Sequence, residues 1–98
     1  MPLDNSWEPK GEHTIITTEG PIHLNIRRID SSNIEWIGWP KTGQKKGSDI
    51  MVVSFKNAAR YIYFGVSRQM AVACAYAESS GVYLNKVIKP RFGCLKVR

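Results

Sequence analysis

The residues best suited to chemistry lie together late in the chain, between positions 83 and 92. They combine aromatic rings, an amide and cationic groups: Tyr83, Asn85, Lys86, Lys89, Arg91 and Phe92. Aromatic rings stack on nucleobases, and each stacked base is worth about 1–3 kcal/mol in single-strand binders. Arginine holds phosphate through two parallel hydrogen bonds, whereas lysine acts as a compact charge. The segment therefore predicts a site for a phosphate-bearing ligand. The same rings would also suit a core beneath a helix, and the same cations a solvated surface.

Two aromatic residues earlier in the chain complete the predicted ligand-binding set. Trp36 and Trp39 fall on opposite faces of a regular strand, so one suits the core and Trp39 is taken as lining a groove or subunit contact. Tyr61 and Tyr63 share a face, with rings in the core and hydroxyls that need a partner. Either hydroxyl can reach a ligand, and Tyr63 is included in the predicted set. The lysines at 41, 45 and 46 suit a solvated hairpin loop equally well.

Catalytic and metal-binding patterns are missing from the sequence. It contains neither a phosphate loop of the form G-x-x-x-x-G-K-[ST] nor a G-x-S-x-G nucleophile turn. His13 and His23 have no cysteine or carboxylate near them at metal-ligand spacing. The glutamates at 12, 19, 35 and 78 are scattered over different elements. We therefore expect a protein that is not an enzyme, with no cofactor and no metal.

Charge is distributed unevenly along the 98 residues. Residues 1–49 hold six Lys and Arg against seven Asp and Glu, a balance of −1. Residues 50–98 hold eight basic residues and a single acid, Glu78, a balance of +7. A basic half favours an anionic partner, although it also serves solubility.

The length fits a single domain. The longest nearly uncharged run, residues 70–77, is too short to span a bilayer, and the N-terminus lacks the features of a signal peptide. We therefore expect a cytoplasmic protein in a bacterium or a phage-infected host. Cys74 lies in an apolar helical pattern, and we expect it and Cys94 to be reduced.

Patterning predicts strands followed by one helix. Residues 1–12 show no periodicity and are interpreted as an arm. A β-branched run at 14–18, a turn at 19–21 and the alternation of Ile22, Leu24 and Ile26 predict a hairpin. Further strands are expected at 34–39, 50–56 and 60–66, with a short strand or turn-rich segment at 82–88 and an edge strand or tail at 95–98.

The strands at 50–56 and 60–66 are apolar on both faces, whereas a sheet covered on one side alternates apolar with polar residues. One helix covers one face, so the hairpin or a second subunit must cover the other. The helix is expected to start at a Ser67 cap, to carry a stripe of Met70, Cys74 and Ala77 with Ala73, and to end at Gly81. The fold class is α+β: a small antiparallel meander, for which a barrel-like form is allowed, packed by one main α-helix, with an added N-terminal hairpin.

Several segments are similar to KTSC domains, which occur alone in bacteria and phages and at the C-terminus of some lysyl-tRNA synthetases. They are Ser31-Ser32-x-Ile34 with Ile37-Gly38-Trp39, Val53-x-Phe55, Tyr61-x-Tyr63, and the run from Ala77 to Lys89. Three features depart from the family pattern: Ser67 replaces a frequent proline, the loop at 41–49 is longer, and the turn before Tyr61 lacks a common glycine. The resemblance assigns 30–98 to the domain and leaves 1–29 as an arm-and-hairpin extension.

The resemblance implies a nucleotide-related or nucleic-acid-related binding role rather than catalysis. The leading hypothesis is a binder that sequesters a small or cyclic nucleotide in a pocket at a homo-oligomer interface. An RNA or single-stranded nucleic-acid-binding module is the first alternative. A protein-interaction domain for an acidic partner is the second.

Overall fold

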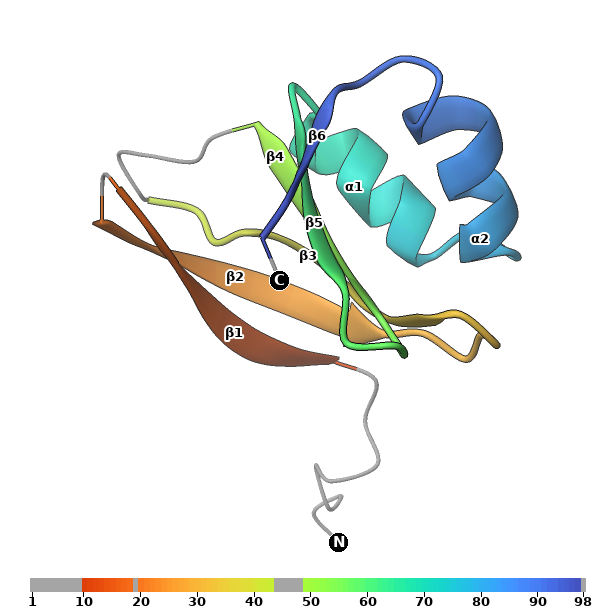
Figure 1. The fold of residues 1–98 in the computed structure, drawn as a ribbon, viewed down its shortest axis with the longest axis horizontal. Coiled ribbons are helices and arrows are strands. Elements are labelled where there is room, and N and C mark those ends of the chain that lie inside the picture. Colours follow the sequence, from red (N-terminus) through yellow and green to blue (C-terminus); the bar gives the residue numbers. More distant parts are fainter. Residues whose placement is uncertain (1–9, 19, 44–48, 98) are drawn as a thin grey trace, which may run out of the picture.

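A six-stranded antiparallel sheet with helices on one face forms the fold of this computed structural model (Figure 1). The structure describes residues 10–18, 20–43 and 49–97. The strands are β1 (Lys10–Thr17), β2 (Gly20–Arg28), β3 (Ile34–Pro40), β4 (Ile50–Phe55), β5 (Arg60–Phe64) and β6 (Cys94–Lys96). They lie in sequence order, each pairing with the next. The expected α+β meander is confirmed. The sheet curls without closing into a barrel (Figure 1).

β1 and β2 form the expected N-terminal hairpin, with Lys10 opposite Arg27 at one end and Thr17 opposite Gly20 at the other. Gly20 has a φ of +116°, a conformation that glycine adopts without steric cost. Pairing begins at Lys10, so the predicted arm at 1–12 is too long, and residues 1–9 lie outside the described part of the chain. β2 continues the sheet into β3, which places the hairpin in the same layer as the rest.

The central strands are buried on both faces, as their apolar residues predicted. The helical face packs Met51, Val53 and Tyr63 against the helices. The opposite face packs Val52 and Ile62 with a larger set, namely Ile15, Ile22, Leu24, Ile26, Trp36 and Ile50. Most of that set belongs to the hairpin, so the curled hairpin covers the second face. A second subunit is not needed for that purpose.

A β-bulge in β3 precedes its two tryptophans. The register shifts between Ile34 and Trp36, after which the strand resumes its alternation. Trp36 joins the hairpin-side core, and Trp39 is half-buried against the helix-side core. The prediction that these side chains lie on opposite faces is confirmed.

The helical layer is α1 (Arg68–Ala75), α2 (Ser80–Tyr83) and η2 (Leu84–Ile88), the last being a π-helical turn. Ser67 caps α1 as predicted, its hydroxyl accepting from the N–H of Met70 at 3.2 Å. The predicted stripe is wrong in detail because α1 has only two turns. Its buried residues are Ala71, Cys74 and Ala75, Ala73 is exposed, and Ala77 lies beyond the helix.

The chain becomes helical again where a strand or turns were expected. Ser79 caps α2, its hydroxyl accepting from the N–H of Val82 at 3.3 Å. Gly81 is therefore inside a helix, and the prediction that it ends one is wrong. Leu84 and Ile88, four residues apart, are buried under the sheet, and this packing outweighs the strand preference of the β-branched residues. None of the helices in the described ranges is long and apolar enough to cross a bilayer.

Candidate functional site

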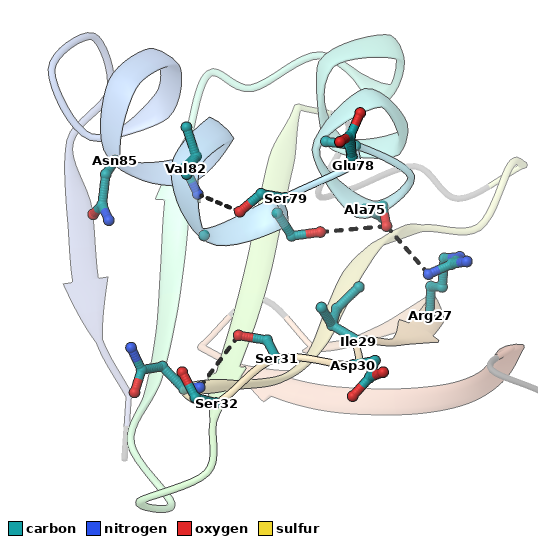
Figure 2. Close-up of a pocket in the computed structure, with 14 residues that line it drawn as sticks. Arg27, Ile29, Asp30, Ser31, Ser32, Ala75, Glu78, Ser79, Val82 and Asn85 are labelled. Carbon is teal, nitrogen blue, oxygen red and sulfur yellow. Dashed lines mark hydrogen bonds between the residues drawn. The ribbon is translucent and has the colours of Figure 1, made fainter.

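A polar cleft of about 610 Å³ lies between the loop after β2 and the loop after α1. Figure 2 shows Asp30, Ser31 and Ser32 on one side of it and Glu78 and Ser79 on the other. Two stretches that carry the family resemblance, 31–34 and 77–89, thus meet across this cleft. The convergence makes it the first place to look for a site.

The hydroxyls of the cleft already have structural partners. Ser31 accepts from the N–H groups of Asn33 and Ile34, at 3.2 and 3.3 Å. Ser80 donates to the carbonyl of Cys74 at 2.8 Å, and Ser79 caps α2. These serines hold the two loops in shape, so their place in the family pattern has a structural explanation.

The charges of the cleft do not favour an anion. Asp30 and Glu78 are exposed carboxylates among its lining residues, against one cation, Arg27. Arg27 lies with its guanidinium carbon 4.3 Å from the ring centre of Tyr76, and it donates to the carbonyl of Ala75 at 3.4 Å. A phosphate placed here would face two like charges.

A second cavity, of about 470 Å³, is an aromatic groove on the helical side of the sheet near β6. Four rings line it, from Phe55, Tyr61, Tyr63 and Phe92. The other lining residues are Asn57, Ala59, Lys89 and Cys94. Lys89 is exposed and is the only charged member of this described lining. The groove therefore offers apolar flat surfaces with one positive charge at its edge.

The ring geometry is set by the strands. Phe55 and Tyr61 meet edge to face, with ring centres 5.8 Å apart at 87°, an arrangement that aromatic pairs prefer. Burial raises the pKa of Tyr63 to about 12, with smaller contributions from Cys94, Tyr61 and Cys74. Its hydroxyl therefore stays protonated at neutral pH and can donate a hydrogen bond to a ligand.

The π-helical turn positions Lys89 and Phe92. The N–H of Lys89 donates to the carbonyl of Leu84 at 2.9 Å, which closes the wide turn. The carbonyl of the fully buried Ile88 accepts from Arg91 and Phe92 at 3.1 and 3.0 Å. π turns are rare and occur frequently at functional sites. The segment after the helix is thus fixed to the core.

The β4–β5 turn beside the groove holds a non-glycine residue in left-handed conformation. Ala58 has a φ of +73°, and its N–H donates to the carbonyl of Phe55 at 3.0 Å. This is the turn that lacks the family's common glycine. Such backbone costs about 1–3 kcal/mol and is found most often near functional sites.

Only part of the predicted ligand-binding set comes together. Tyr63, Lys89 and Phe92 share the aromatic groove. Asn85 lines the polar cleft instead. Tyr83 and Trp39 are half-buried against the helix-side core. Lys86 and Arg91 are exposed and are not among the residues that line either cavity.

Sequence reasoning did not place Phe55, Asn57, Tyr61 and Cys94 in this site. A signal was available for the rings, because the alternation of β4 and β5 puts Phe55, Tyr61 and Tyr63 on one face. No local pattern pointed to Asn57 or Cys94. Lys45 and Lys46 lie outside the described residues.

The cysteines are both free thiols, as expected. Cys74 is buried, and burial raises the pKa of its thiol to about 12. Cys94 is exposed at the groove.

The two histidines of the hairpin have separate partners. The Nδ1 atom of His23 lies 3.0 Å from the hydroxyl of Thr14. The Nε2 atom of His13 lies 3.1 Å from Nη1 of Arg60, and the rings of His13 and Trp36 are 5.1 Å apart. Arginine can only donate, so His13 accepts through Nε2 and is neutral. Burial and the charge of Arg60 lower the pKa of His13.

We expect the stability of the fold to fall as pH drops below about 6.5. In the unfolded chain His13 takes up a proton near 6.5, whereas in the fold its pKa is lower, so acid favours unfolding. Urea unfolding at pH 7.5 and 5.5 measures the difference. His13→Gln keeps an acceptor and should lose most of this dependence.

The ion pair of Glu12 with Lys41, at 2.8 Å, lowers the pKa of Glu12 from 4.5, so any contribution of this pair to stability is lost only below that pH. The Glu12 ion pair therefore does not account for a stability difference between pH 7.5 and pH 5.5. An equal pH slope in the wild type and in His13→Gln would contradict the assignment.

Comparison with known proteins agrees with this architecture. The family model of the KTSC domain matches residues 30–92. A protein of Tsukamurella paurometabola is 33% identical over 67 residues, covering 68% of this chain and 92% of the relative. The crystal structure of a KTSC domain protein from Yersinia pestis aligns with a TM-score of 0.63 and 25% identity, covering 76% of this chain and 99% of that one. The chain belongs to the KTSC domain family.

Proposed function

We propose that this KTSC domain is a non-enzymatic binding protein for a phosphate-bearing nucleotide, held in the aromatic groove. The observation that carries the proposal is the convergence of four rings and Lys89 around one cavity. Its volume, about 470 Å³, lies within the roughly 300–1,000 Å³ of small-ligand pockets.

Each part of a nucleotide has a counterpart in the groove. The base would stack on exposed parts of Phe55, Tyr61 or Phe92, a contact worth about 1–3 kcal/mol. The buried Tyr63 would offer its hydroxyl, and the amide of Asn57 a polar edge. Lys89 would meet the phosphate as a compact charge.

The groove is a better nucleotide site than the polar cleft, even though the cleft is larger. The cleft brings Asp30 and Glu78 toward any phosphate, whereas the groove brings Lys89. We expected the pocket at a subunit boundary because the second apolar face of the sheet needed a cover. The hairpin covers most of that face, so the proposed site lies within one chain.

A small ligand fits this site better than a long nucleic acid. A polymer gains affinity from many neutralised phosphates, each of which releases counterion, and the groove provides one lysine. The protein would act by holding its ligand and lowering the free concentration, as a sequestering protein does.

Isothermal titration calorimetry against mono-, di- and cyclic nucleotides, with polyuridylate alongside, tests the proposal. We expect saturable binding of at least one short nucleotide with weak salt dependence. Binding of polyuridylate alone, with affinity that falls steeply as salt rises, would replace the proposal with the RNA alternative. If no member of the panel binds, the remaining hypothesis is a protein-interaction domain for an acidic partner.

A further inference from the structure

Exposed apolar side chains gather in one place on the face opposite the helices. An apolar cleft of about 480 Å³ lies between β1 and the β5–β6 edge. Around it stand Ile16, Phe64, Leu95 and Val97, which are 80%, 48%, 55% and 43% exposed. Its floor includes Ile22, Ile50 and Ile62, all buried. Clustered apolar exposure of this kind marks an interaction site, whereas scattered exposure does not.

The backbone beside this cleft has an open pairing edge. In the described part of the chain β6 pairs with β5 alone, so β1 and β6 are the two edges of the curled sheet (Figure 1). The carbonyl of Gly93 accepts from the N–H of Phe64 at 3.0 Å, and the N–H of Val97 donates to the carbonyl of Arg60 at 2.8 Å. Antiparallel strands alternate in the direction of these groups. The N–H and C=O groups of Cys94 and Lys96 therefore point away from β5.

The side chains of β6 divide between the two faces. Cys94 and Lys96 lie opposite Tyr63 and Tyr61, on the helical side. Leu95 lies opposite Ile62, on the side of the hairpin core. A strand added to β6 would thus find hydrogen-bonding groups at Cys94 and Lys96 and an apolar surface beside Leu95.

The cleft is bounded on its far side. The 3.1 Å contact between His13 and Arg60 joins β1 to β5 across the curled sheet. A smaller cavity of about 220 Å³, lined by Thr14, Ile15, Ile16, Arg60, Ile62 and Val97, continues the cleft in that direction. With β1 held close, the gap suits one extended chain better than a folded second copy.

We propose that the β6 edge binds an extended peptide segment of a partner protein, which pairs with Cys94 and Lys96 as an added strand. Main-chain hydrogen bonds would supply affinity, and apolar residues at alternate positions would enter the cleft. None of the described residues that line the cleft is charged, so the inward-facing positions of the peptide would be uncharged. The cleft and the nucleotide groove lie on opposite faces, so the proposal is independent of nucleotide binding.

Selection of random peptides of about twelve residues, displayed against the full chain, tests this proposal. We expect the enriched peptides to carry apolar residues at every second position. A selected peptide, made synthetically, should lose binding when N-methylated at the positions that face β6 and keep it at the intervening ones. A strand shows this period of two, and a helix does not.

Substitutions around the apolar cleft test whether the selected peptide binds there. Phe64→Ser and Leu95→Ser should each weaken the selected peptide about tenfold or more, which corresponds to about 1.4 kcal/mol. Val82→Ser is the matched control, because Val82 is 51% exposed but lies on α2, and it should leave the affinity unchanged. Absence of enriched peptides, equal sensitivity of all three variants, or N-methylation effects without alternation would overturn the proposal.

Discussion

Replacing Lys89 with alanine should weaken nucleotide binding by about 1.5–3 kcal/mol, the range for hydrogen bonds to charged groups. That range corresponds to a loss of about tenfold to 150-fold in affinity. Lys89 is the one charged residue in the described lining of the aromatic groove, so its loss leaves that lining without a cation. Calorimetric titration with the tightest nucleotide of the panel measures the loss.

Lys86→Ala is the control, because Lys86 is another exposed lysine of the same helical end and is not among the residues that line the groove. It should lower the affinity only slightly, and the melting temperature of both variants should barely change because exposed charges add little stability. Equal losses from the two variants would indicate diffuse attraction and favour the RNA alternative.

Replacing Ile88 with alanine should lower the free energy of unfolding by about 2–5 kcal/mol, as is usual when a buried isoleucine is truncated. Ile88 is completely buried in the helix-side core, and its carbonyl accepts from both Arg91 and Phe92. The cavity left behind would loosen the turn that presents Lys89 and Phe92. Urea unfolding monitored by circular dichroism measures the change.

Ile88→Val removes one methylene and should cost only about 0.5–1.5 kcal/mol. Val82→Ala, at an exposed position on α2, should stay within about 0.5 kcal/mol of the wild type. A loss from Ile88→Ala no larger than that of Val82→Ala would show that the turn does not depend on this side chain.

The sheet was predictable from the sequence because its signals are local. The alternation of Met51, Val52 and Val53 fixes which side chain enters which core, and the structure confirms it. The cap at Ser67 was predictable for the same reason, since a hydroxyl and an N–H three residues apart are sufficient.

The second helical segment was not predictable in this way. Val82, Val87 and Ile88 are β-branched and favour strands in isolation. The helix forms because it buries Leu84 and Ile88 against a sheet built from residues far away in the sequence. That tertiary contribution leaves no local pattern.

The incorrect prediction for this second helical segment also explains why the ligand-binding set was only partly correct. The prediction treated the side chains between 83 and 92 as one set because they are close in the sequence. A helix distributes side chains around its axis, which sends Asn85 to the polar cleft and packs Tyr83 against the core. Lys89 and Phe92 reach the groove because they follow the π turn, and they meet Phe55 there through tertiary packing alone.

The sequence order of the strands has a kinetic consequence. Each strand pairs with its neighbour in the chain, so most backbone pairings close short loops and the entropy lost in closing them is small. Relative contact order should accordingly be low for a sheet protein, and folding faster than in sandwiches whose pairings are distant. The sheet can grow one hairpin at a time. The contact between His13 and Arg60 spans 47 residues, so we expect it to form last, when the finished sheet curls.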